Sequence, residues 1–529
     1  MAAKANGAGE LEAIIARTAL KYDLLPYQSK PFAQSQPGRL GGMARLFGLE
    51  TVPLGNARVL ELGCASGGNI IPLAMRYPDA QFVGVDLSRT QVAAGRARIA
   101  GLGLSNIEIL CQSFTEIDEK LGSFDYIICH GVYSWVPPLV QNAILEITRA
   151  RLSPLGVAYV SYNVLPGWRM LQHLRDAFLL TVPDHHDSVA RVAKARELLA
   201  FLKDATPDKG AYGQMLQTWA DRLSNLPDDY IAHEFLEETN SPSTVREFAA
   251  DARRHNLAFL GECDLHSMIV DNYPAETAAR VRAMTGNDLV ESEQMLDLIT
   301  GRTFRQTLLV GNERLDQINR ALSPACLDGL YFVVGRDMQF ARTDTGATLS
   351  DGSGRQMTTT LPAVAAGLER LVTRFPSASS IDDCADALTK AQLADNGRAL
   401  VADALYRMLV AGMITVSSEP INLPSAVSKK PLALAIARAD AASGAEYTTN
   451  ARHETISLDP GARVLLPALD GTRTASALAA VLVDAVKAGQ LNFNRDGQPV
   501  TEPAALPGIA EAFLPQLLSN IAAAALLEG

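Results

Sequence analysis

Val59-Leu-Glu-Leu-Gly-Cys-Ala-Ser-Gly-Gly-Asn69 is the stretch around which the rest of this chain is arranged. The apolar run over 58–62 is long enough for one buried strand, and a glycine-rich turn over 63–68 follows it at once. The apolar residues of 69–77 then recur at helical spacing. Strand, glycine turn and helix form the first half of a βαβ unit. Its glycines are expected to let the backbone approach a ligand closely, because a Cβ atom there would collide with it. The start of its helix offers free N–H groups to a polar ligand.

The next predicted strand, over 81–86, indicates the kind of ligand. It ends in Asp86, and an acid that closes the second strand of such a unit lies where a ribose binds. A dinucleotide site would read G-x-G-x-x-G, whereas the spacing from Glu61 to Gly67 is acid-x-Gly-x-x-x-Gly, with Ala65 between. No phosphate-loop lysine follows. The pattern therefore suits an adenosine with an uncharged or cationic tail, and the competing interpretation is a plain βα turn.

Length and composition limit the remaining possibilities. A chain of 529 residues predicts two to four domains, and 48% hydrophobic with 20% charged residues permits a large core. The net charge of −11 argues against a nucleic acid as the main partner. No apolar stretch reaches membrane-spanning length, and the first residues lack the apolar segment of a signal peptide. The six cysteines form no Cys-x-x-Cys pair, so we expect no metal site or disulfide framework, and a cytoplasmic protein.

Polar and aromatic residues follow the predicted fourth and fifth strands, over 124–129 and 157–162. The carboxyl ends of strands in an open α/β sheet line the ligand crevice, so side chains placed there face a site. The candidates at this edge are His130, Tyr133, Trp135, Tyr162, Asn163 and Trp168. The competing interpretations are a hydrogen-bonded core histidine at 130 and ordinary aromatic packing for the others.

An arm precedes the first strand, within residues 1–50. A helix is predicted over 10–24, and an extended, proline-containing segment over 22–32 overlaps its end and carries Tyr22, Tyr27 and Phe32. The arm either packs on the sheet or forms a lid that excludes water from the ligand.

The rest of the chain completes the sheet and then changes character. Helices dominate from about 170 to 240, which predicts an insertion, and later segments up to 311 supply the last helices and two strands of the sheet. Residues 312–420 read as a winged-helix-like domain, and a Pro/Ser linker separates them from a small α/β domain over 432–529. The adjacent His185 and His186 point to different helix faces and are not expected to bind a metal. The predicted fold is α/β, a Rossmann-like sheet with a helical insertion, followed by α+β winged-helix-like C-terminal domains.

Several motifs occur together and in order: Tyr22-Asp-x-x-Pro-Tyr27, Glu61-Leu-Gly-Cys-Ala-Ser-Gly-Gly-Asn69, His130-Gly-Val-Tyr-Ser-Trp135, Tyr162-Asn163, Pro166-Gly-Trp168 and Arg302-x-Phe-Arg-Gln-Thr-Leu308. With them the chain resembles class I S-adenosylmethionine-dependent methyltransferases, whose domain would span 51–311. It resembles in particular bacterial proteins that carry a methyltransferase regulatory domain, a group that includes lysine methyltransferases of outer-membrane proteins. The resemblance implies a regulatory segment over about 215–300.

The resemblance also implies S-adenosyl-L-methionine as the cofactor and assigns residues to it. The glycine loop would lie along the methionine part, the acid of the second strand would bind the ribose, and the end of the third strand would approach the adenine. The residues expected to bind the cofactor are Glu61, Gly63, Cys64, Gly67, Asp86, Leu87, Gln112, Ser113 and His130.

The expected reaction is direct in-line transfer of a methyl group to a lysine side chain of a protein. A dry pocket would lower the pKa of the lysine and help it to lose its proton. We expect Tyr133 and Asn163 to act in catalysis, with Asn163 orienting an N–H group and His130 as a candidate proton acceptor. Tyr27, Trp135, Tyr162 and Trp168 would complete the substrate pocket. The alternatives are a small-molecule methyltransferase and a non-catalytic, cofactor-binding scaffold.

Overall fold

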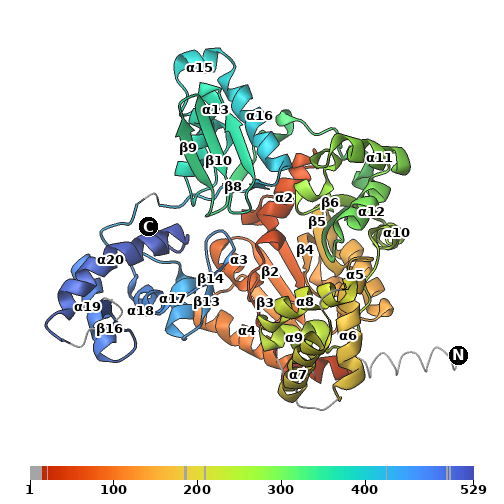
Figure 1. Cartoon of the computed structure of the whole chain (residues 1–529), viewed down its shortest axis with the longest axis horizontal. Helices are drawn as coiled ribbons and strands as arrows, with labels where there is room; N and C mark the ends of the chain where they lie inside the picture. Colours follow the sequence, from red (N-terminus) through yellow and green to blue (C-terminus); the bar gives the residue numbers. More distant parts are fainter. Residues whose placement is uncertain are drawn as a thin grey trace.

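A seven-stranded sheet forms the centre of the computed structural model, which describes residues 15–20, 22–24, 26–183, 188–207, 210–424, 426–495, 498–499 and 502–528. The strand order is β3-β2-β1-β4-β5-β7-β6 (Figure 1). The strands are β1 (Arg58–Leu62), β2 (Gln81–Asp86), β3 (Ile107–Cys111), β4 (Phe124–Cys129), β5 (Leu152–Asn163), β6 (Leu257–Glu262) and β7 (Phe304–Gly311). The first five are parallel, and β7 runs antiparallel to both of its neighbours. The Rossmann-like sheet predicted from the sequence is thereby confirmed.

Helices cover both faces of this sheet, and alternate strand residues explain why. Val59 and Phe82 point to one face, while Leu60 and Val83 point to the other, and all four are buried. The helices α2 (Pro37–Leu46), α3 (Ile70–Arg76) and α4 (Arg89–Leu102) contribute to the first face. The second face is covered by α5 (Pro138–Arg151) and α10 (Val245–Arg254), and α11 (Ala275–Thr285) and α12 (Leu289–Thr300) come between β6 and β7.

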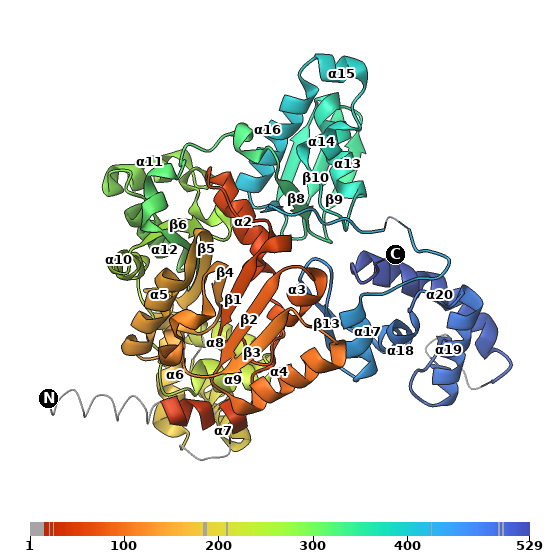
Figure 2. The ribbon, with the colours of Figure 1, turned by 180° about the vertical axis from the view of Figure 1, so that it is seen from behind.

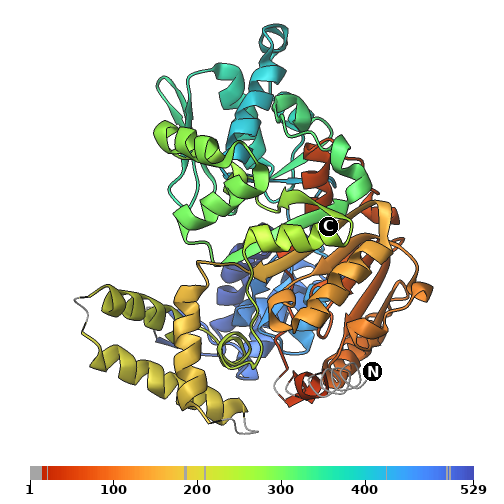
Figure 3. The same cartoon turned by 90° about the vertical axis from the view of Figure 1, so that its right-hand side faces the viewer.

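Four helices separate β5 from α10 and form a group of their own. They are α6 (Arg169–Thr181), α7 (Ser188–Ala205), α8 (Ala211–Ser224) and α9 (Asp228–Phe235). Their buried residues form a separate apolar cluster, and Figure 3 shows them projecting from one side of the molecule. The predicted insertion coincides with this group, and His185 and His186 lie outside the described residues.

The segment after β7 forms a second α+β unit joined closely to the first. It contains β8 (Tyr331–Val334), β9 (Gln339–Thr343), β10 (Gly346–Ser350), β11 (Gln356–Thr359), α13 (Pro362–Thr373), α14 (Ile381–Ala385), α15 (Lys390–Ala394), α16 (Gly397–Val410) and β12 (Ile414–Ser417). The end of β12 reaches α2, where Ser418 N donates to the Gly38 carbonyl at 2.8 Å. The apolar residues of this middle unit belong to the same cluster as one face of the large sheet.

The last part of the chain has its own apolar core. This C-terminal module, over 426–528, contains α17 (Ala435–Ala442), β13 (Tyr447–Thr449), β14 (Thr455–Ser457), α18 (Pro460–Leu465), α19 (Ala475–Lys487), β15 (Asn494–Arg495), β16 (Gln498–Pro499) and α20 (Leu506–Ala523). The hairpin β13–β14 and α17 lie beside α3 and α4 of the large sheet (Figure 2). In the part of the chain that the structure describes, no helix has the length and apolarity needed to span a membrane.

Candidate active site

The glycine loop between β1 and α3 depends on its glycines for two different reasons. Gly63 and Gly67 have φ angles of +77° and +79°, a conformation that glycine adopts without strain. A Cβ atom on Gly63 would also lie 2.4 Å from Cγ2 of Val132. At Gly68, a Cβ would meet the backbone carbonyl carbon of Ser29 at 2.3 Å. The close neighbour at Gly68 is therefore the N-terminal arm, whereas the sequence led us to expect a ligand there.

Asp86 closes β2 and receives two backbone hydrogen bonds. Ala65 N donates to Oδ2 at 2.8 Å, and Ser88 N donates to Oδ1 at 2.9 Å. Burial raises the pKa of Asp86, and these two N–H groups oppose the rise. Ala65 has a φ of +49°, which is unusual for a residue with a side chain, and its bond to Asp86 fixes that turn. The carboxylate is thus held at the strand end where a ribose diol would bind.

Glu61 lies deeper in the loop and has one carboxylate oxygen to spare. Its Oε1 accepts a hydrogen bond from Nδ2 of Asn69 at 2.7 Å. Its Oε2 is buried and has no hydrogen-bond partner among the described residues. Burial raises the pKa of Glu61 to about 8. A buried carboxylate oxygen without a partner fits a cationic group, such as the ammonium of a methionine moiety.

The N-terminal arm lies across this loop. Gly68 N donates to Ser29 Oγ at 2.7 Å, and Phe32 N donates to Asn69 Oδ1 at 2.9 Å. At the other end, Ser88 Oγ donates to Asp23 at 2.5 Å. The described residues 15–20 and 22–24 are helical, and the start of the predicted helix lies outside the described residues. The position of the arm agrees with a lid, and that role stays a prediction.

His130 follows β4 and sits under the arm. Its Nδ1 is 2.8 Å from the Tyr159 hydroxyl, and its ring lies 3.8 Å from that of Phe32, centroid to centroid. Burial, together with the nearby charge of Lys30, lowers the pKa of His130 to about 3. The imidazole is therefore neutral and a weak base at neutral pH. This favours a role for His130 in shaping the cofactor site over a role as proton acceptor.

Tyr133 and Tyr162 lie in the protein core under α10. The Tyr162 ring stacks on Phe248 at 4.1 Å, and the Tyr133 ring meets Phe248 edge-on at 5.2 Å. Neither tyrosine is more than 2% exposed, and the Tyr162 hydroxyl accepts a hydrogen bond from Thr307 Oγ1 at 3.3 Å. The sequence predicted a narrow pocket at these residues, with ordinary aromatic packing as the alternative. In the structure α10 packs over both rings, as in the alternative.

Unpaired polar atoms gather where β5 ends. Asn163 Nδ2 and Trp168 Nε1 are buried without a hydrogen-bond partner among the described residues, and so are Ser243 Oγ and the amide of Asn240. Ser243 N donates to the Asn163 carbonyl at 3.2 Å, which places these residues side by side. The ring of Trp135 packs edge-on against Trp168 at 6.1 Å. Asn163 therefore keeps an amide N–H group that is unpaired within the described part of the chain. Its predicted role, to orient an N–H group, would use the side-chain carbonyl instead, and that role stays a prediction.

The remaining predicted cofactor residues form two groups, which differ in whether they adjoin Asp86 through the backbone or already have a side-chain partner within the protein. The Cys64 thiol packs under the sheet against Gly84, and burial raises its pKa. Ser113 Oγ caps a short 3-10 helix by accepting from Thr115 N at 3.3 Å. Gln112 N donates to the Asp86 carbonyl at 3.1 Å, and the Leu87 carbonyl accepts from the Cys111 thiol. Gln112 and Leu87 therefore lie next to Asp86, while the side chains of Cys64 and Ser113 have structural partners.

The structure adds an acid that the sequence interpretation missed. Glu234, on α9, is partly exposed, and no described residue donates a hydrogen bond or forms an ion pair with its carboxylate. Loss of hydration raises its pKa to about 8. Burial raises the pKa of Tyr22, Tyr27 and Tyr230, and the negative charge of Glu234 adds to each of these rises.

The insertion thereby meets the arm beside the cofactor loop. The His233 ring stacks on Tyr22 at 4.7 Å and meets Tyr27 edge-on at 5.9 Å. Burial raises the pKa of Tyr22, and the negative charges of Glu237, Asp86 and Glu234 add to the rise. The sequence could have indicated that Glu234 lies beside a tyrosine, because Tyr230 and Glu234 are four residues apart and share a helix face.

The strand order with an antiparallel β7, the glycine loop after β1 and the acid after β2 define a class of enzymes. The chain is an S-adenosylmethionine-dependent methyltransferase. Residues 59–156 match the sequence profile described as a methyltransferase domain, and 227–311 match the predicted methyltransferase regulatory domain. Residues 429–526 match the PKMT C-terminal winged helix domain. The winged-helix description thus falls on the C-terminal module, which the sequence interpretation described as a small α/β domain.

Similarity to individual proteins shows to which family of methyltransferases the chain belongs. The chain is 32% identical to protein RP789 of Rickettsia prowazekii, over 96% of this chain and 93% of that protein. It is 36% identical to RP028 of the same organism, over 46% of this chain and 97% of that protein. PKMT2 from Rickettsia typhi, solved in complex with AdoHcy, superposes with a TM-score of 0.83 at 28% identity, covering 95% of this chain and all of PKMT2. The chain belongs to the family of methyltransferases that join a regulatory domain to a PKMT winged-helix domain.

Proposed function

We propose that this enzyme transfers the methyl group of S-adenosylmethionine to the ε-amino group of lysine side chains in a protein. The cofactor, when bound, supplies a methyl group that is already activated by its sulfonium. The similarity to PKMT2, a protein lysine methyltransferase, supports the proposal because it extends over 95% of this chain. The C-terminal module supports it as well, because a small substrate needs no additional recruiting domain.

The observation that carries the proposal is the Glu234 carboxylate among tyrosines. A lysine arrives as an ammonium, which has no lone pair and must lose a proton before it can attack a methyl group. Tyrosine rings attract a cation through their faces, and a carboxylate with a pKa of about 8 is well matched to accept a proton near neutral pH. Glu234, Tyr22, Tyr27 and Tyr230 together provide both functions beside the cofactor loop.

The remaining residues take positioning roles in this proposal. Asp86 would hold the ribose hydroxyls, and the free Oε2 of Glu61 would receive the ammonium of the cofactor. The arm would close over both and exclude water. Asn163, at the end of β5, would orient an N–H group of the substrate through its side-chain carbonyl. Tyr133 and Tyr162 would act indirectly, by supporting this edge from the core.

The proposal includes the domain division of the enzyme, its location in the cell and its partners. We propose the division predicted from the sequence, with a methyltransferase domain over 51–311, a middle domain over 312–420 and a last domain from 432. We also propose a cytoplasmic enzyme that has no nucleic-acid partner, since the net charge of −11 would repel a polyanion.

The experiment compares Glu234→Gln with Glu197→Gln, a surface change on α7 of the same helical insertion. Purified variants receive radiolabelled S-adenosylmethionine and a lysine-rich protein mixture, and the labelled products are hydrolysed to amino acids. We expect wild type and Glu197→Gln to yield labelled Nε-methyl-lysine. We expect Glu234→Gln to lose about a hundredfold or more in kcat, in the range typical of a proton acceptor. Equal rates in Glu234→Gln would remove Glu234 from the mechanism, and label in another amino acid or in small molecules would contradict the lysine assignment.

A further inference from the structure

The tip of the β13–β14 hairpin touches the cofactor loop. His453 Nε2 lies 2.8 Å from Asn69 Oδ1, although the two residues are 384 positions apart in the sequence. His453 is only 4% exposed, and Asn69 is 2% exposed. The C-terminal module therefore brings one buried polar side chain into contact with Asn69, at the end of the glycine loop. Figure 2 shows β13 of this hairpin beside α3, the helix that follows the loop.

The hydrogen bonds around Asn69 fix its orientation. The backbone N–H of Phe32 can only donate, and its acceptor at 2.9 Å must be the amide oxygen. The amide nitrogen then faces Glu61 Oε1 at 2.7 Å, where it donates. Because His453 also meets the amide oxygen, its Nε2 must carry the proton and donate. His453 thus donates a hydrogen bond to Asn69, and Asn69 in turn donates one to Glu61.

His453 itself is held in an unusual conformation by its neighbours. Its φ of +63° is uncommon for a residue with a side chain, and its N–H donates to the Asn450 carbonyl at 3.0 Å. A non-glycine residue in this region of backbone space persists only when its surroundings impose it. Burial lowers the pKa of His453 to about 3, so the side chain stays neutral and the contact does not depend on its protonation.

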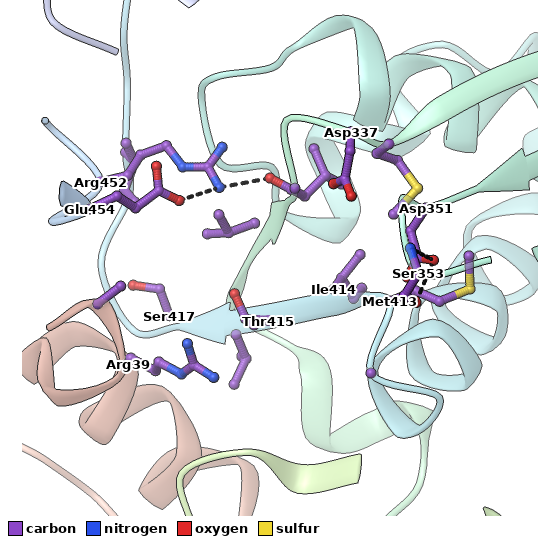
Figure 4. Close-up of a pocket in the computed structure, with 18 of the residues that line it drawn as sticks. Arg39, Asp337, Asp351, Ser353, Met413, Ile414, Thr415, Ser417, Arg452 and Glu454 are labelled. Carbon is purple, nitrogen blue, oxygen red and sulfur yellow. Dashed lines mark hydrogen bonds and ion pairs between the residues drawn. The ribbon is translucent and has the colours of Figure 1, made fainter. Parts of the chain in front are cut away.

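The residues beside His453 anchor the hairpin tip to the middle unit. Arg452 donates to the Val334 carbonyl at 2.7 Å and pairs with Glu454 at 3.1 Å, at the edge of a cavity of about 300 Å³ (Figure 4). Its guanidinium also lies over the ring of Phe375 at 5.1 Å. The hairpin tip is therefore fixed by the middle unit on one side and presents His453 to the cofactor loop on the other.

We propose that His453 is a positioning residue for the cofactor. It holds the Asn69 amide, the amide holds one oxygen of Glu61, and the other oxygen of Glu61 is thereby kept in place for the ammonium of the cofactor. Docking of the C-terminal module and binding of the cofactor are consequently coupled, whichever substrate the enzyme methylates. Such coupling is reciprocal, so the bound cofactor also tightens the hairpin.

The first test measures binding of S-adenosylhomocysteine to full-length His453→Ala and His453→Gln by calorimetry. Alanine removes the donor, and we expect the Kd to rise about tenfold, in line with the loss of one buried hydrogen bond. Glutamine carries an N–H at a similar reach and should restore most of the affinity. The KM for S-adenosylmethionine should follow the Kd, while kcat at saturating cofactor stays close to wild type.

A matched control removes another polar contact between the same two parts of the molecule. Arg98, on α4, pairs with Asp440, on α17, at 2.6 Å and does not touch the cofactor loop. Arg98→Ala should therefore leave the Kd unchanged. In a Glu61→Gln background, His453→Ala should weaken binding by less than it does in wild type, because its effect passes through Glu61. An effect of Arg98→Ala equal to that of His453→Ala, or full additivity with Glu61→Gln, would contradict the proposal.

Hydrogen exchange on the wild-type protein provides a second test, which involves no substitution and therefore no folding defect. We expect S-adenosylhomocysteine to slow exchange in the hairpin over 447–457 as well as in the glycine loop. Protection confined to the large sheet and the arm would overturn the proposal. An unchanged Kd in a folded His453→Ala variant would overturn it equally.

Discussion

At the scale of single residues, two acids with raised pKa values distinguish this site, and only one of them could be selected from the sequence. Glu61 stands in a motif whose spacing predicts a nucleoside site, so pattern alone was sufficient to select it. Glu234 stands in an ordinary amphipathic helix. Its importance depends on α9 packing against the arm, where Tyr22 and Tyr27 come within its reach. Helical periodicity predicts the helix but not the element that it meets.

The pH dependence of catalysis tests the role of Glu234. Its carboxylate must be ionised to accept a proton, and its pKa is about 8, so kcat/KM should rise with pH and level off above about pH 8. In Glu234→Gln the pH at which kcat/KM rises should move to a higher value, towards the pKa of the substrate lysine itself. Rates measured from pH 6 to 10 with a lysine peptide check this. If kcat/KM rises at the same pH in the variant as in wild type, another group accepts the proton.

The pH dependence of stability tests Glu61. Its pKa rises from a usual value of 4.5 to about 8 on folding, so its contribution to stability is complete below about pH 4.5 and is lost as pH rises through 8. Glu61→Gln should therefore reduce the fall in melting temperature between pH 6 and 9 in the protein without cofactor. Thermal scans across this range decide the matter, and parallel curves for the two proteins would contradict the burial argument.

At the scale of elements, apolar runs located the strands, whereas long-range pairing and capping set the details. The second of the two strands predicted in the later segments up to 311 is β7, and its antiparallel place between β5 and β6 completes the sheet. Its sequence also contains Arg305, which is 1% exposed and pairs with Glu262, Glu293 and Asp297. The sequence shows the arginine, but its three partners lie on two other elements, Glu262 on β6 and the other two on α12. Periodicity does not reveal that these elements meet at Arg305.

Arg305→Leu should be strongly destabilising. The change leaves three acids in the core without their shared cation, and breaking a buried charge network from one side costs about 3–5 kcal/mol. Urea unfolding followed by circular dichroism measures the loss. The control is Arg246→Leu, which breaks an exposed pair with Glu291 and should leave the unfolding midpoint almost unchanged. Similar midpoints for the two variants would refute a stabilising role for the network.

The arm and the glycine loop can be separated by a single methyl group. In Gly68→Ala the new Cβ would collide with the Ser29 backbone, so the arm must move off the loop. We expect weaker binding of S-adenosylhomocysteine and a higher KM for the cofactor. Gly101→Ala, in α4, meets no atom within 4 Å and serves as the control. Unchanged binding in Gly68→Ala would mean that the arm is not part of the cofactor site.

At the scale of the whole molecule, the three parts of the chain converge on one loop. The arm, the helical insertion and the C-terminal module all reach the cofactor loop or its margin. The sequence predicted the parts themselves, because composition and turn residues change between them. It could not predict that His453 meets Asn69, since a contact between residues 384 positions apart leaves no periodic trace.

The negative charge of the molecule predicts how it meets its substrate. A net charge of −11 attracts the basic segments in which lysines occur, and dissolved salt screens that attraction. The KM for a lysine-rich protein should therefore rise several-fold between about 50 and 300 mM salt, while the Kd of S-adenosylhomocysteine changes little. Steady-state kinetics at several salt concentrations test this, and a KM that falls with salt would indicate apolar recognition instead.

The most direct test of the central claim is methyl transfer in a lysate from cells that lack this protein. Purified enzyme and radiolabelled S-adenosylmethionine are added, proteins are separated from small molecules, and Asp86→Ala serves as the variant without a ribose ligand. We predict label in discrete protein bands, recovered as methylated lysine and absent with Asp86→Ala. Label found only among small molecules, or protein label that persists with Asp86→Ala, would contradict the assignment of this site to protein lysine methylation.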